Sequence, residues 1–158
     1  MRLTLMTDYA LRLLMYVARN PDRLCTIGEV AAAHAISDAH LMKVTHKLGL
    51  GGWLETVRGK GGGVRLALAP QAINVGAVVR SVEPDFFLVE CLGGGERCKL
   101  TGNCRLTGVV NGALHSFLEH LDRYTLADLL QGPPSQLGMA VAVKPPTRRR
   151  AAAPPRRP

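Results

Sequence analysis

Three cysteines lie close together in the segment CLGGGERCKLTGNC: Cys91, Cys98 and Cys104, separated by spacers of six and five residues. A disulfide uses two thiols and a closed structural zinc site takes four ligands, so three thiols leave one partner to be found. The spacers are longer than those of common zinc-binding cysteine pairs. An iron–sulfur cluster accepts thiolates from a longer loop, and the glycines here would let the chain wrap such a cluster closely. An iron–sulfur cluster, a zinc ion and ordinary thiols all remain open on this pattern.

The remainder of the sequence excludes several classes of protein. The chain opens directly into MRLTLMTDYALRLL, without the cationic and apolar regions of a secretory signal, and has no apolar run of about 18 residues. We therefore expect a cytoplasmic protein with reduced thiols. Cys25, far from the other cysteines, is expected to be a small buried residue. No Ser/His/Asp order, phosphate-binding loop or paired acidic motif supports an enzyme.

The positive charge is distributed unevenly. The net charge is +8, but residues 132–158 contain six Lys or Arg and no acid, which leaves 14 basic and 12 acidic residues elsewhere. Within residues 40–66, five Lys or Arg accompany a single acid, Glu55. This local excess indicates an anionic partner better than the total does.

The elements around this basic region follow from apolar spacing and capping residues. Thr26 and Glu29 form a capping-box pattern before a short helix, and Ser37 can cap a third helix. After Gly51-Gly52, two short apolar runs flank GKGGG, which predicts a β-hairpin with a basic tip. The predicted helices cover residues 7–20, 30–35, 38–50, 75–82, 104–121 and 125–131. The Pro/Ala/Arg-rich residues 132–158 lack this periodicity and are predicted to be disordered.

Two short helices followed by a basic hairpin predict a winged helix-turn-helix, mainly α with a small β-hairpin wing. A major groove admits one helix, and a cationic hairpin tip can reach the backbone or the minor groove beside it. Each basic feature alone is more typical of a solvated surface or a loose turn, but together and in this order they favour binding to double-stranded DNA. The candidate DNA contacts are Ser37, His40, Lys43, Lys47, Arg58 and Lys60. The apolar stripe over 104–121 is wide enough to serve both the core and a partner.

Several motifs together resemble one family of winged-helix iron–sulfur regulators, and within it the nitric-oxide-sensing repressors. They are MRLTLMTDYALRLL, the ISDAHLMKV helix, the VRGKGGGVRLA wing, the three-cysteine loop and FLEHLDRYTLADLL, which cover residues 1 to about 131. Another branch, which regulates cluster assembly, carries a histidine ligand three residues after the third cysteine, where this sequence has Thr107. The resemblance is therefore to the nitric-oxide branch.

The resemblance implies a homodimer through the long helix 105–121, with one cluster per subunit held by Cys91, Cys98 and Cys104. It also implies that Asp8 of the opposite subunit supplies the fourth ligand and that nitrosylation of the cluster releases operator DNA. We favour a [4Fe-4S] over a [2Fe-2S] cluster, although the six-residue spacer does not by itself decide the cluster type. A first-turn carboxylate such as Asp8 otherwise only favours a helix N-terminus. The alternatives are a regulator of cluster assembly and a zinc or thiol redox switch. The predicted organisation is a winged-helix domain over 1–83, a cluster loop over 84–104, dimerisation and closing helices over 105–131, and a tail over 132–158.

Overall fold

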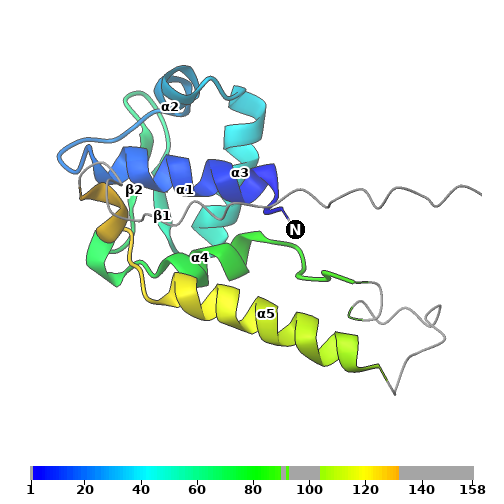
Figure 1. Ribbon diagram of the computed structural model, residues 1–158. Coiled ribbons are helices and arrows are strands. Elements are labelled where there is room, and N and C mark those ends of the chain that lie inside the picture. Colours follow the sequence, from blue (N-terminus) through cyan, green and yellow to red (C-terminus); the bar gives the residue numbers. More distant parts are fainter. Residues whose placement is uncertain (1, 90–91, 93–103, 132–158) are drawn as a thin grey trace, which may run out of the picture.

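The computed structural model describes residues 2–89, 92 and 104–131. Cys91, Cys98 and the predicted disordered tail lie outside these residues, so the expectations for them are not tested. The described chain is mostly helical, with one two-stranded sheet (Figure 1). Its helices are α1 (Leu5–Ala18), α2 (Ile27–His34), α3 (Asp38–Leu50), α4 (Val75–Val82) and α5 (Arg105–Asp122). The strands β1 (Leu54–Val57) and β2 (Gly63–Leu66) form the hairpin. The predicted fold class, a helical protein with a small β-hairpin wing, is confirmed.

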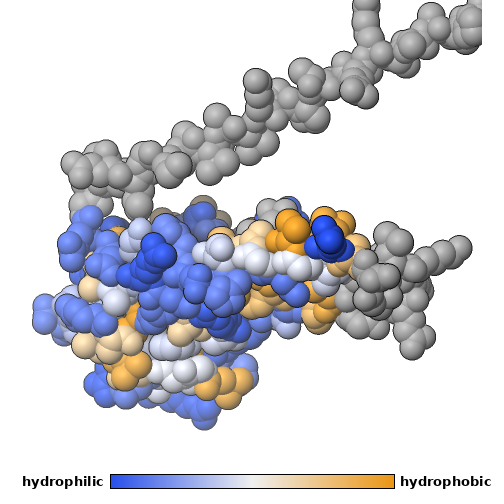
Figure 2. All heavy atoms as spheres, turned by 60° about the horizontal axis from the view of Figure 1, so that its bottom comes forward, coloured by the Kyte–Doolittle hydropathy of each residue, from blue (hydrophilic) through white to orange (hydrophobic). Residues whose placement is uncertain are grey.

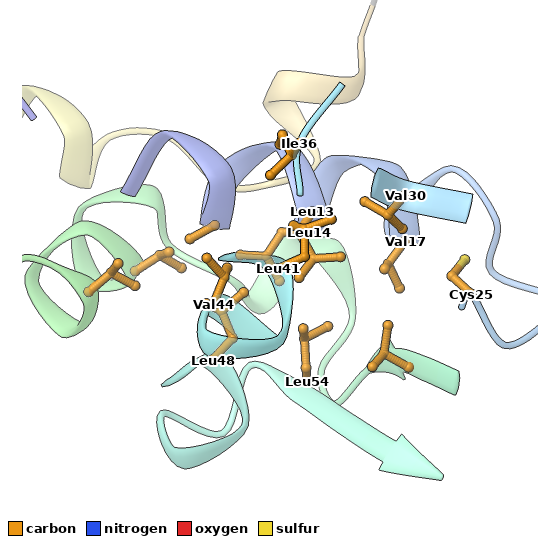
Figure 3. Close-up of a cluster of buried hydrophobic side chains, with 14 of the residues drawn as sticks. Leu13, Leu14, Val17, Cys25, Val30, Ile36, Leu41, Val44, Leu48 and Leu54 are labelled. Carbon is orange, nitrogen blue, oxygen red and sulfur yellow. The ribbon is translucent and has the colours of Figure 1, made fainter. Parts of the chain in front are cut away.

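Helix α1 is the centre of the hydrophobic core. Its residues Leu13, Leu14 and Val17 are almost fully buried, at helical spacing, and meet the buried stripe of α3 (Figure 3). That stripe is Leu41, Val44 and Leu48, as the sequence predicts. Full burial of such a side chain contributes about 1.5–3 kcal/mol. This core therefore fixes α3 relative to α1 and leaves the opposite side of α3 exposed.

The turn between α2 and α3 is built by three consecutive residues. Ala35 ends α2 in the left-handed conformation at φ 53°, and Ile36 is buried in the core. Ser37 then caps α3, because its hydroxyl oxygen accepts a hydrogen bond from the backbone N–H of His40 at 3.4 Å. The predicted capping box at the start of α2 also forms, with Glu29 N donating to Thr26 Oγ1 at 3.2 Å.

Strand β2 of the hairpin also pairs with the chain that precedes α2. Leu54 pairs with Leu66 and Val57 with Gly63, in antiparallel register. Cys25 extends this pairing: its N–H donates to the Val64 carbonyl at 2.9 Å, and the Val64 N–H donates to the Cys25 carbonyl at 2.8 Å. The hairpin is therefore tied to the core, while its tip extends away.

Helix α5 lies alongside α4 and extends beyond it (Figure 1). None of its 18 residues is fully buried, which distinguishes it from the other helices. Within the predicted closing helix over 125–131, only a short 3-10 helix, Asp128–Leu130, forms. At its start, the Asp128 carboxylate accepts hydrogen bonds from the N–H and the hydroxyl of Thr125, both at 2.7 Å. Among the described residues, no helix is long and apolar enough to cross a bilayer.

Candidate nucleic-acid interface and cluster ligands

The exposed side of α3 carries Met42, Lys43 and His46. Across from it, the first residues of the hairpin tip are exposed, including Arg58 and Lys60. Between the two elements lies a groove of about 310 Å³, lined by Ile27, Met42, Thr45, His46, Thr56 and Arg58. A recognition helix and a basic wing therefore present cationic and polar groups on one surface, as DNA recognition requires.

The wing tip has its shape because of its glycines. Gly59 and Gly61 have φ values of 100° and 78°, which side-chain-bearing residues rarely adopt. A Cβ on Gly62 would lie 2.3 Å from the Val57 carbonyl oxygen. These three glycines allow a tight turn that leaves Lys60 and Arg58 facing solvent.

The two lysines that the sequence places on one DNA-facing side of α3 have different surroundings. Lys43 is exposed, whereas Lys47 is half-buried and its ammonium donates to the Val82 carbonyl oxygen at 2.5 Å. A DNA contact by Lys47 stays a prediction, and this geometry favours Lys43. His40 lies in the first turn of α3, beside its cap and α1. Its Nδ1 is 2.9 Å from Ser37 Oγ, and the centre of its ring is 6.1 Å from that of Tyr9.

Asp8 lies in the first turn of α1, where the sequence predicts it. Its carboxylate forms two contacts with Arg12, Nε to Oδ1 at 3.0 Å and Nη2 to Oδ2 at 3.0 Å. The Asp8 side chain is 44% exposed, so the carboxylate is accessible from solvent.

Of the three clustered cysteines, the structure describes Cys104 alone. It is half-buried and directly precedes α5 at the N-cap position, where its side chain makes no capping hydrogen bond. In the described part of the chain, no three His, Cys, Asp or Glu side chains gather closely enough to hold a metal ion. A ligand set that included Asp8 and Cys104 would therefore need the remaining cysteines as well.

Cys25 is fully buried, which confirms the prediction that it is a small core residue. Burial raises the pKa of its thiol, an effect that the nearby Arg23 partly offsets. A buried, protonated thiol is a poor metal ligand and a poor nucleophile.

Comparison with known proteins agrees with this geometry. The family model of Rrf2, described as an iron-dependent transcriptional regulator, matches residues 3–132. The chain belongs to the Rrf2 family. Two curated relatives are named HTH-type transcriptional regulator NsrR. The one from Bacillus licheniformis is 47% identical over 132 residues, covering 82% of this chain and 92% of that protein. The one from Bacillus subtilis is 46% identical over 133 residues, covering 83% and 91%.

Solved structures support the same fold. The global cysteine regulator CymR of B. subtilis aligns with a TM-score of 0.63 and 25% identity, covering 82% of this chain and 96% of that one. IscR of T. potens aligns with a TM-score of 0.66 and 24% identity, covering 82% and 86%. The chain is thus a winged-helix transcriptional regulator of the Rrf2 family rather than an enzyme, as predicted. The two relatives named NsrR also confirm that this sequence resembles the NsrR regulators within the family.

Sequence reasoning missed two groups of residues, one in the groove and one at the end of α4. Met42 and Thr56 line the groove between α3 and the wing, although neither is charged. Met42 could have been found, because its spacing from Leu41 and Val44 places it away from the core stripe. The polar links of Ser81 and Glu83 to distant elements carry no sequence signal that would have found them.

Proposed function

We propose that this Rrf2 regulator is a homodimeric repressor that binds operator DNA through α3 and the wing, and that responds to nitric oxide through an iron–sulfur cluster. The observation that supports the DNA surface most directly is the groove between α3 and the wing, with His46 on one side and Arg58 on the other. Exposed Lys43 and Lys60 add positive charge to the same two elements. Such charges bind phosphates and release counterions.

The exposed apolar side of α5 supports the dimer. Leu106 and Val109 are 58% and 69% exposed on this helix. Figure 2 shows apolar side chains gathered at the end of the molecule where the N-terminal half of α5 lies. A two-fold dimer through this surface would place two recognition helices on half-sites about one helical turn apart, so we expect a near-palindromic operator.

The donor set predicted by the sequence fits a cluster with mixed ligands. Thiolates of Cys91, Cys98 and Cys104 are the ordinary ligands of iron–sulfur clusters, and a [4Fe-4S] cluster takes one further ligand. When bound, such a cluster supplies iron atoms that can react with nitric oxide. We propose that the Asp8 carboxylate of the opposite subunit is the fourth ligand. A hard oxygen donor of this kind would bind iron less firmly than a thiolate.

The present partner of Asp8 does not prevent this role. The ion pair with Arg12 joins residues four positions apart, with side chains 44% and 47% exposed. Exposed pairs of this kind contribute only about 0.3–0.5 kcal/mol. Rotating the Asp8 carboxylate from Arg12 to a metal ligand position therefore costs little.

The salt dependence of operator binding tests the DNA surface. Lys43→Ala and Arg58→Ala should each weaken binding and reduce the slope of log K against log salt by up to about 1, because each removes a phosphate contact. Arg123→Ala, which removes the same charge just after α5, is the control and should leave the slope unchanged. Unchanged slopes in both α3 and wing variants would contradict the proposed surface.

Metal analysis tests the cofactor. Protein purified without oxygen should contain iron and sulfide and absorb visible light. Zinc in their place, or no metal at all, would favour the thiol or zinc switch instead.

A further inference from the structure

The C-terminal end of α4 bonds to three separate parts of the DNA-binding region through three consecutive residues. The first is Ser81, whose hydroxyl oxygen accepts a hydrogen bond from Trp53 Nε1 at 2.9 Å. The same hydroxyl donates to the Val78 carbonyl at 2.7 Å, which fixes its direction. Trp53 directly precedes β1, so this bond connects α4 to the base of the wing.

The second residue is Val82, whose carbonyl oxygen accepts the hydrogen bond from Lys47 Nζ. A carbonyl in the last turn of a helix has no partner within the helix, and a cation there is favoured by the helix dipole. Val82 itself is buried. The recognition helix α3 is therefore attached to α4 by a charged hydrogen bond within a half-buried contact.

The third residue is Glu83. Its Oε1 accepts hydrogen bonds from Thr4 N at 2.7 Å and from Thr4 Oγ1 at 3.2 Å. Thr4 is the N-cap of α1, where its Oγ1 also accepts from Thr7 N at 3.4 Å. Glu83 thus holds the start of α1, the turn that carries Asp8.

Beyond Glu83 the chain continues through Pro84, which lacks a backbone N–H and does not extend the helix, towards the cysteine segment. We propose that Ser81, Val82 and Glu83, here termed the α4 junction, couple the state of the cysteine segment to the recognition helix and the wing. In this role Lys47 positions α3 rather than contacting DNA. The coupling rests on the proposed function, since it needs an effector at the cysteines, whereas the assignment of Lys47 does not.

Two lysines one turn apart on α3 provide a matched test of the Lys47 assignment. Lys43→Met and Lys47→Met each remove one positive charge and keep most of the aliphatic side chain. The slope of log K against log salt for operator binding should fall by up to about 1 in Lys43→Met and stay at the wild-type value in Lys47→Met. An equal fall in Lys47→Met would overturn its assignment as a positioning residue. An unchanged slope in Lys43→Met would instead contradict the proposed DNA surface.

The coupling is tested by the ratio of operator affinities measured before and after nitric oxide treatment of the cluster-loaded protein. Glu83→Ala should reduce this ratio about three- to tenfold relative to wild type, because the start of α1 is no longer held by α4. Glu83→Gln keeps an oxygen that can accept from Thr4 and should restore most of the ratio. Asp128→Ala is a matched control: Asp128 also accepts from both the N–H and the hydroxyl of one threonine, Thr125, but lies outside the junction.

The outcomes separate the two proposals. A wild-type ratio in folded Glu83→Ala, or the same loss in Asp128→Ala and Glu83→Ala, would overturn the coupling role of the α4 junction. A ratio of one in the wild-type protein would contradict the proposed function and the coupling with it, and the salt slopes would still decide the assignment of Lys47.

Discussion

Arg80 on α4 and Asp122 at the end of α5 face each other through two contacts of 2.6 Å, Nη1 to Oδ1 and Nη2 to Oδ2. The hydrogen bonds from Arg80 hold the pKa of Asp122 below its ordinary value. Asn74, the N-cap of α4, adds a bond from its side-chain amide to the Asp122 carbonyl at 2.7 Å. The helix proposed to form the dimer is thus fastened to the helix that bonds to the DNA-binding elements.

This arrangement predicts opposite effects of one substitution at two similar positions. Gly76 and Gly28 are each the second residue of a helix, α4 and α2. A Cβ at position 76 would lie 2.0 Å from Asp122 Oδ1, whereas a Cβ at position 28 meets nothing within 4 Å. We expect Gly76→Ala to lower the free energy of unfolding, because it separates Arg80 from Asp122.

Gly28→Ala should instead keep or raise the free energy of unfolding by up to about 1 kcal/mol, as alanine favours a helix over glycine. Denaturant unfolding of both variants checks this. If both variants changed the free energy of unfolding equally, the absence of a side chain at Gly76 would not be needed for α5 to pack against α4.

The four cysteines should separate into two classes. Replacing Cys91, Cys98 or Cys104 by Ser should give protein with little iron, because each removes one of the proposed thiolate ligands. Cys25→Ala should retain iron and visible absorbance, since that thiol is buried and its pKa is raised. Iron assays after anaerobic purification check this, and a colourless Cys25→Ala would require a different ligand set.

Asp8 and Arg12 allow a paired test of the fourth ligand. Both Asp8→Ala and Arg12→Ala remove the same ion pair, so both lose the same small stabilisation of α1. Only Asp8→Ala should make the cluster more labile and change its nitric oxide titration, because only this variant lacks the carboxylate. Identical titrations of the two variants would reduce Asp8 to a first-turn carboxylate that stabilises α1.

The dimer is tested by placing a charge on the exposed side of α5. Val109→Asp should shift the protein from dimer to monomer in sedimentation experiments, because a carboxylate would be buried between the subunits. Leu68→Asp is a control, as Leu68 is an exposed apolar residue outside α5. A dimer that survives Val109→Asp unchanged would place the interface elsewhere.

Much of the fold follows from local sequence. The bounds of α3 and α4 agree with the prediction, because Ser37 and Asn74 cap them and their apolar residues keep helical spacing. The closing helix is shorter than the predicted residues 125–131, since only Asp128–Leu130 form a 3-10 helix. A segment this short closes too few intrahelical hydrogen bonds for its sequence pattern alone to fix its extent.

The candidate site was predictable in composition but not in geometry. Periodicity placed Lys43 and Lys47 on one polar side of α3, and it correctly excluded both from the core stripe. It could not show that α4 ends beside Lys47, because the bond to Val82 joins residues 35 positions apart. Pairings over such distances depend on how α3 and α4 pack together, which no local pattern encodes.

The central claim is that nitric oxide controls DNA binding through the cysteine-bound cluster. The most direct measurement is operator affinity of anaerobically purified, cluster-loaded protein during a nitric oxide titration, with iron and absorbance followed in the same samples. We predict that affinity falls about 5- to 150-fold, in step with the change in cluster absorbance, as is typical of coupling between two sites. An affinity that stays constant while the cluster absorbance changes would contradict the claim.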